Sequence, residues 1–173
     1  MLLQGKKVKL RALEPEDLSF LFRTENDTTF WEVSHTQTPF SKFLLKQYLE
    51  NAHLDIYEAK QLRLIIEEEE TKQPVGMIDL FDFNPQHKRA GIGIVIDKKF
   101  QKLGYASEAM SLFITYCFTQ LNLHQLYATI TPDNKDSISL FERHNFKKAG
   151  EKKDWIFLNG SFKNELIYQL IHE

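Results

Sequence analysis

The segment Gln101–Ala106 has the residue types and spacing best suited to binding a phosphate. It follows a strand rich in Ile and Val, Ile92–Asp97, and precedes a long helix, Ser107–Leu121. The free N–H groups in the first turn of a helix converge on one point, where the helix dipole is positive. Gly104 lets the backbone approach a phosphate closely, and Ala106 is small enough to keep that approach clear. The pattern therefore predicts an anion site, with an ordinary strand-to-helix loop as the alternative.

The elements that must position this loop alternate between strands and helices. Apolar and charged residues alternate over Val8–Ala12, which is typical of a half-buried strand. Pro15 and the acids after it favour a helix start, whereas the polar stretch Asn26–Thr38 is expected to be a loop. The other expected elements are a helix from Thr38, strands at Leu62–Glu67, Val75–Phe81 and Leu126–Thr131, a helix at Asp136–His144, and strands at Trp155–Leu158 and Phe162–Leu170 around the hairpin signal Asn159-Gly160.

This order, β-α-α-β-β-β-α-β-α-β-β, predicts an α/β (α+β) fold. Hairpins mixed with helical crossovers imply a mixed, mostly antiparallel central sheet with helices on both faces. The length of 173 residues supports one domain, expected over residues 1–173, and 42% apolar residues supply a core.

Charge and cysteine content exclude several classes of protein. Twenty-two basic and 24 acidic residues give a net charge of −2, which argues against a nucleic-acid partner. The single cysteine, Cys117, excludes an intrachain disulfide and fits a reducing compartment. The longest apolar stretch, Leu112–Leu121, is too short to span a bilayer, and the six histidines lack metal-ligand spacing. We therefore expect a cytoplasmic protein without a membrane partner or a bound metal.

The phosphate loop and its surroundings resemble a known family. Q-x-x-G-x-A between a strand and a long helix resembles the acetyl-CoA pyrophosphate loop of the GCN5-related N-acetyltransferase (GNAT) superfamily, whose element order also matches. The stretch from Asn134 through Ser137 to Phe146 is similar to that family's N-x-x-S-x-x-x-Y-x-K-x-G-F segment. V-K-L-R-A-L-E-P-E-D-L and F-L-N-G-S-F-K-N-E most resemble spermidine N-acetyltransferases, and ribosomal-protein N-terminal acetyltransferases share the general pattern.

The resemblance implies acetyl-CoA as the cofactor and indicates where it would bind. A strand edge would pair with the pantetheine arm, and an amide of that strand would stabilise the oxyanion. Asn134 would contact the cofactor near the thioester, with a helix cap as the equal alternative. The implied cofactor residues are Ile94, Val95 and Ile96 on the strand, Gln101, Lys102, Leu103, Gly104, Tyr105 and Ala106 in the loop, and Asn134 and Phe141 beyond it.

Acetyl transfer also needs a neutral amine, and a carboxylate can accept its proton. An alkylamine with a pKa near 10.4 costs about 4 kcal/mol to deprotonate at pH 7. Glu32 lies in the loop that covers the substrate in the family, and Asp82 ends a strand near the family's substrate groove, so these two and Asn134 are the candidate catalytic residues. Asp79 ranks below them. The alternative is an exposed loop acid for Glu32 and the polar half of a strand's alternation for Asp79. The acidic run Glu67–Glu70 would attract a polyamine, but is more typical of a hairpin turn.

Phe141 departs from the family pattern, because it stands where a tyrosine is often the general acid. A phenyl ring cannot donate a proton, although a thiol with a pKa of about 8.5 leaves reasonably well as a thiolate. The predicted function is an N-acetyltransferase that moves acetyl from acetyl-CoA to a primary amine by direct attack in a ternary complex. The amine would belong to a polyamine, another small molecule or a protein N-terminus, and a homo-oligomer is left open. The alternative is a catalytically weak acyl-CoA-binding or sensor module.

Overall fold

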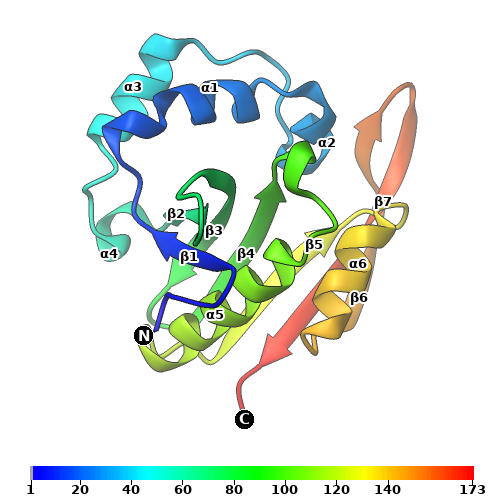
Figure 1. Cartoon of the computed structure of the whole chain (residues 1–173). Coiled ribbons are helices and arrows are strands. Elements are labelled where there is room, and N and C mark those ends of the chain that lie inside the picture. The colour runs from blue at the N-terminus through cyan, green and yellow to red at the C-terminus, as the bar shows by residue number, and fades with distance from the viewer. Residues whose placement is uncertain (1) are drawn as a thin grey trace.

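A mixed sheet of seven strands, in the order β1-β2-β3-β4-β5-β7-β6, forms the centre of the computed structural model, which describes residues 2–173 (Figure 1). Only β4 and β5 run parallel among the neighbouring pairs, so the expectation of a mostly antiparallel sheet is confirmed. The strands are β1 (Val8–Arg11), β2 (Leu62–Glu68), β3 (Pro74–Asn84), β4 (Arg89–Ile96), β5 (Gln125–Ile130), β6 (Lys147–Leu158) and β7 (Ser161–Ile171).

Helices cover both faces of the sheet, as the sequence predicts (Figure 1). On one face, Ile65 of β2 and Met77 of β3 pack with Leu21 and Leu45. Phe113 is fully buried against the opposite face. The helices are α1 (Leu18–Glu25), α2 (Trp31–Ser34), α3 (Lys42–Glu50), α4 (Ile56–Ala59), α5 (Tyr105–Thr119) and α6 (Lys135–Arg143), with 3-10 turns at Pro15–Asp17, Thr28–Phe30 and Lys98–Phe100. Successive side chains of a strand point to opposite faces, so Leu64 and Ile66 of β2 pack on the side of Phe113, whereas Ile65 packs on the side of Leu21.

Some expected elements differ from the structure, since β3 runs to Asn84 beyond the expected Phe81, and α4 has no counterpart among the expected elements. The stretch expected to be one loop, Asn26–Thr38, contains a 3-10 turn and α2. The strand expected to begin at Trp155 begins at Lys147. β6 is an edge strand that carries two register shifts and many charged residues, so the apolar alternation that marks a strand is broken over its first half.

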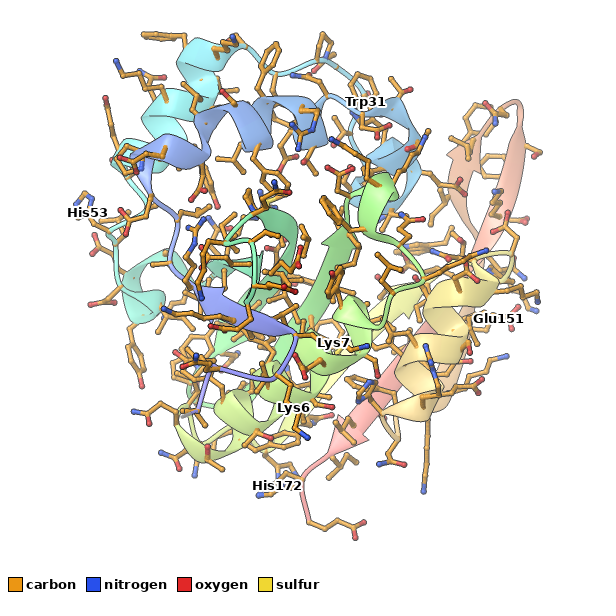
Figure 2. All side chains as sticks on the ribbon, viewed as in Figure 1. Lys6, Lys7, Trp31, His53, Glu151 and His172 are labelled. Atoms are coloured by element: carbon orange, nitrogen blue, oxygen red, sulfur yellow. The ribbon has the colours of Figure 1, made fainter. Side chains whose placement is uncertain are left out.

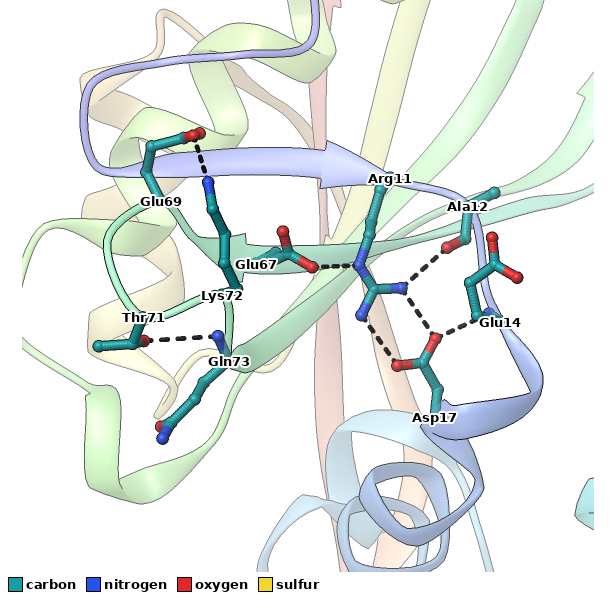
Figure 3. Close-up of polar contacts among 9 residues, drawn as sticks. All are labelled: Arg11, Ala12, Glu14, Asp17, Glu67, Glu69, Thr71, Lys72 and Gln73. Carbon is teal, nitrogen blue, oxygen red and sulfur yellow. Dashed lines mark hydrogen bonds and ion pairs between the residues drawn. The ribbon is translucent and has the colours of Figure 1, made fainter.

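Arg11 fastens β1 to the neighbouring strand and to the first helical turn (Figure 3). Its guanidinium donates to both carboxylate oxygens of Asp17 at 2.9 Å, and it also donates to Glu67 on β2. Asp17 is buried, and its hydrogen bonds with Arg11 help to raise the pKa of the guanidinium. The two parallel hydrogen bonds of this pair fix the orientation of the guanidinium as well as its position.

The acidic run Glu67–Glu70 lies at the end of β2 and in the turn that leads to β3 (Figure 3). Glu68 accepts a hydrogen bond from Thr71 at 2.9 Å, and Glu69 accepts one from Lys72 at 2.7 Å. These carboxylates are engaged by their own turn, which supports the hairpin interpretation.

Candidate active site

β4 and β5 diverge after a short stretch of pairing. They pair only from Arg89 to Gly91 on β4, opposite Gln125 to Tyr127 on β5. Beyond Gly91, β4 continues to Ile96 with β3 on one side, and within residues 2–173 no strand pairs with its other edge. Unpaired N–H and C=O groups on such an edge can pair with an extended ligand.

A cavity of about 660 Å³ opens where the two strands separate. This volume lies within the range of about 300–1,000 Å³ that is typical of small-molecule and cofactor sites. The cavity joins β4, the glycine loop, the start of α6 and the segment that holds α2. Its lining includes Ile94, Val95, Ile96, Gln101, Lys102, Gly104, Tyr105, Ala106, Glu32 and Asn134, so most of the predicted cofactor residues are brought together.

A smaller cavity of about 60 Å³ continues from the first one, deeper between β4 and β5. The two cavities share six lining residues: Glu32, Val33, Ile94, Thr131, Asn134 and Ser137. The smaller cavity is also lined by Phe141, which is buried and packs edge-to-face on Phe146 with ring centroids 4.9 Å apart. A ligand that follows β4 from the glycine loop would therefore reach the smaller cavity with its far end.

The glycine loop is held in a conformation that suits anion binding. Gly104 has a φ of +87° and stands as the residue before the first turn of α5, a backbone conformation that favours glycine. Gln101 donates from its side-chain amide to the carbonyl of Ile96 at 3.0 Å, which ties the loop to the end of β4. Lys102 and Arg143 also line the larger cavity, and their cationic side chains would attract phosphates.

Leu103 differs from its neighbours in the loop. It does not line the larger cavity, its side chain is about half exposed, and its carbonyl accepts a hydrogen bond from Lys7 at 3.1 Å. The Glu108 carboxylate in the first turn of α5 accepts backbone hydrogen bonds from Lys7 and Val8, both at 2.7 Å. Figure 2 shows Lys6 and Lys7 where β1 passes α5. These hydrogen bonds hold the N-terminus of α5 against β1.

Glu32 lies on α2 and lines both cavities. Its carboxylate accepts a hydrogen bond from Lys163 on β7 at 2.7 Å, and the same ammonium donates to Asp133 at 2.7 Å. The hydrogen bond to Asp133 raises the pKa of Lys163 most, and the bond to Glu32 raises it further. The same Lys163–Asp133 bond lowers the pKa of Asp133. Lys163 therefore bridges two carboxylates beside the cavities.

Asn134 also lines both cavities, and its side chain caps α6. Its carbonyl oxygen accepts a hydrogen bond from the backbone N–H of Ser137 at 3.3 Å. The helix-cap interpretation is confirmed, and the same position places the residue beside any ligand in the cavities.

Asp82 and Asp79 lie outside both cavities. The expectation that Asp82 sits at the substrate groove is not met, because this residue lies near the closed end of the split, where Gly91 pairs with Tyr127. Its carboxylate accepts a hydrogen bond from the Tyr127 hydroxyl at 2.9 Å, and burial together with this bond raises the pKa of Tyr127 to about 12. Asp79 instead pairs with Arg63, which donates to its two oxygens at 2.8 and 2.9 Å.

Glu165 is a site residue that sequence reasoning missed. It lies on β7, is only 6% exposed, and lines the smaller cavity. Within residues 2–173 its carboxylate makes no hydrogen bond or ion pair, and its oxygens keep some access to solvent. The available signal was an acid directly before the apolar run Leu166–Tyr168, inside a strand.

The described residues hold neither a metal cluster nor a membrane-spanning helix. In the part of the chain that the structure describes, no three His, Cys, Asp or Glu side chains are grouped to hold a metal ion. No helix between residues 2 and 173 has both the length and the apolar character needed to cross a membrane. Cys117 is buried in the core, and burial raises the pKa of its thiol.

The divided sheet, with a glycine loop at one end of the exposed strand edge, is the arrangement of an acyl-CoA-dependent transferase. A family model described as "Acetyltransferase (GNAT) domain" matches residues 7–147. The chain belongs to this family, and it is an acetyl-CoA-dependent N-acetyltransferase.

Known proteins similar to the chain include spermidine acetyltransferases. The spermidine N(1)-acetyltransferase of Escherichia coli K12 is 30% identical over 162 residues, which cover 92% of this chain and 83% of that protein. The fold matches a crystal structure of spermidine N-acetyltransferase from Vibrio cholerae in complex with CoA and spermine, with a TM-score of 0.87, 24% identity and 96% of each chain covered. A Bacillus subtilis protein provisionally named a ribosomal N-acetyltransferase is 30% identical over 96 residues, 56% of this chain and 52% of that protein. These relatives are named as transferases, so the sensor-module alternative has no support.

Proposed function

We propose that the protein acetylates a primary amine of a polyamine, with acetyl-CoA along β4 and the amine in the smaller cavity. The observation that carries this proposal is the pair of joined cavities, lined with carboxylates near the point where they meet. Glu32 lines both cavities, Asp133 lines the larger, and Glu165 lines the smaller. Lys163 bridges Glu32 and Asp133, so one lysine stands against three carboxylates at this junction, and the excess of acid favours a cationic acceptor over a neutral one. The similarity to spermidine acetyltransferases supports the same class of substrate.

In this proposal the cofactor is held at three places. The first-turn N–H groups of α5, with Lys102 and Gly104, bind the pyrophosphate. The free edge at Ile94–Ile96 pairs with the pantetheine arm. Asn134 contacts the cofactor near the thioester, where it lines both cavities.

Transfer follows by direct attack of the amine on the thioester. An N–H of Ile94 or Val95 stabilises the oxyanion that forms on the carbonyl oxygen. Phe141 contributes an apolar wall to the smaller cavity and no proton, so the sulfur leaves as a thiolate. Glu32 belongs to the amine side of the site and acts by attracting the cationic substrate.

The proposal extends to assembly and location. The hairpin between β6 and β7 exposes more than half of the Trp155, Phe157 and Phe162 side chains. Exposed aromatic side chains gathered on one hairpin support self-association into a homo-oligomer. Light scattering after size-exclusion chromatography would test this, and a monomer at micromolar concentration would contradict it.

We also propose that the whole chain forms one acetyltransferase domain and works in the cytoplasm.

The test is the release of free CoA thiol from acetyl-CoA with a panel of amines. The panel holds spermidine, putrescine, an amino sugar and peptides with free N-termini. Turnover that is highest with spermidine or putrescine supports the proposal. Turnover confined to the peptides would move the substrate class to protein N-termini, and no turnover with any amine would contradict the proposal.

A further inference from the structure

Glu165 is a largely buried residue whose carboxylate makes no hydrogen bond or ion pair within residues 2–173 and faces a cavity. The pairing of β5 with β7 ends at Ile130 and Leu166, so Glu165 is the next residue of β7, just beyond the end of β5. A carboxylate in so enclosed a position is normally hydrogen-bonded or paired with a cation. The lining of the smaller cavity includes this residue, so the cavity offers a place for the missing cation.

The charged groups around Glu165 leave it free to meet a ligand. Glu32 and His35 line the same cavity from α2 and its C-terminal end, but Glu32 is already paired with Lys163. Lys163, two residues earlier on β7, is shared between Glu32 and Asp133. On β6, the register partner of Glu165 is Lys152, whose ammonium lies 4.4 Å from the centroid of the Trp155 ring.

We infer that Glu165 is the carboxylate that receives the substrate ammonium and takes its proton when the nitrogen attacks acetyl-CoA. This inference rests on the proposed function and names a group for one step of it. Glu165 is better suited to this step than Glu32, because the Glu32 carboxylate is engaged by a lysine and the Glu165 carboxylate is not. The small volume of the cavity, about 60 Å³, admits the end of an alkylamine and little more.

The step balances without any further reactant. The ammonium gives one proton to Glu165, and the neutral nitrogen then attacks the thioester carbon, so a C–N bond forms. The tetrahedral intermediate collapses, the C–S bond breaks, and the electron pair leaves with the sulfur. The nitrogen loses its second proton through water to the thiolate, which gives CoA and the amide. Glu165 returns its proton to water through the larger cavity.

The test compares how the activity of wild type and Glu165→Gln depends on pH. With spermidine at pH 6.5–8.5, the ammonium form dominates, because alkylamines have a pKa near 10.4. A protein carboxylate that removes the proton keeps kcat/KM nearly flat with pH in wild type. In Glu165→Gln only the free amine can react, so kcat/KM should fall by about 10²–10⁴-fold at pH 7 and rise about tenfold for each pH unit. The matched control is Glu142→Gln, an exposed acid on α6, which should keep the wild-type value and profile.

Two further measurements separate this role from a structural one. His35→Gln should keep a flat profile, because His35 lines the cavity but is not the proton acceptor. Formate or acetate should restore activity to Glu165→Ala, whose cavity lacks the carboxylate. A wild-type kcat/KM that rises tenfold per pH unit, a Glu165→Gln profile parallel to wild type, or Glu165→Ala without rescue would each overturn the inference. The absence of turnover in wild type with any amine would instead contradict the proposed function.

Discussion

Gly104→Ala tests whether the glycine loop binds the cofactor. Gly104 has a φ of +87°, and the left-handed region costs a residue with a Cβ about 1–2 kcal/mol. The new Cβ would lie 2.7 Å from the ammonium of Lys7, which is the end of a flexible side chain and can move away. The strain of the backbone therefore accounts for most of the loss of stability. For a chain of this size it corresponds to a fall in Tm of about 2–8 °C, so the variant should stay folded.

The effect on the cofactor should be larger than the effect on stability. If φ relaxes toward negative values, the N–H groups at the start of α5 turn away from the phosphates. A hydrogen bond to a charged group contributes about 1.5–3 kcal/mol, so losing one weakens acetyl-CoA binding by roughly 10-fold to 150-fold. Calorimetric titration with acetyl-CoA measures this change directly.

Gly160→Ala is the matched control for the backbone effect. Gly160 has a φ of +79° in the β6–β7 hairpin turn, and a Cβ there would meet no atom within 4 Å. It should lower the Tm to a similar extent and leave the affinity for acetyl-CoA unchanged. Wild-type affinity in Gly104→Ala, or an equal loss in both variants, would refute the assignment of the loop.

The other predictions concern residues around the site and in the core. Phe141→Tyr should change kcat by less than about threefold in steady-state kinetics, because a thiol with a pKa near 8.5 leaves as a thiolate without help from an acid. A tenfold rise in kcat would mean that the phenol is the missing acid. Asp82→Asn should keep wild-type turnover, since Asp82 accepts a hydrogen bond from Tyr127 and lines neither cavity. Asparagine tolerates the φ of +48° at this position. A loss of turnover above tenfold would mean that Asp82 is a catalytic residue. Arg63→Met should destabilise the fold by about 2–4 kcal/mol in urea unfolding, because Glu25 and Asp79 lose their shared counter-charge; Arg63→Lys should cost less, and an unchanged midpoint would contradict the role of this network. Cys117 should react with a thiol reagent only after denaturation, because it is fully buried; rapid labelling of the folded protein would show that the core opens there.

Features that depend on neighbours in the sequence were predictable. The glycine loop was found because a strand, a glycine and a long helix follow one another within about thirty residues, and the structure places most of this segment in one cavity wall. The sheet type and the helices on both faces also follow from the local order of elements, since each apolar stripe needs a face to cover.

Features that depend on distant pairs were not predictable. Lys163 and Glu32 are 131 residues apart, and neither local sequence indicates that the two side chains meet. The same holds for Glu165, which becomes a cavity residue only because β5 ends opposite Leu166. Asp82 was misplaced for a related reason: β3 runs past it to Asn84, and which end of the split Asp82 faces depends on the register of three strands.

The short pairing of β4 with β5 links the stability of this protein to the supply of its cofactor. The sheet consists of two portions, β1–β4 and β5–β7, whose strands are joined by three residue pairs. A cofactor bound in the split would contact both portions and act as an additional tie between them. Any ligand that binds only the folded state at 100 times its Kd stabilises it by about 2.7 kcal/mol. The ligand-free enzyme should therefore open along the split more readily than the cofactor-bound one, and its Tm should rise with the concentration of acetyl-CoA.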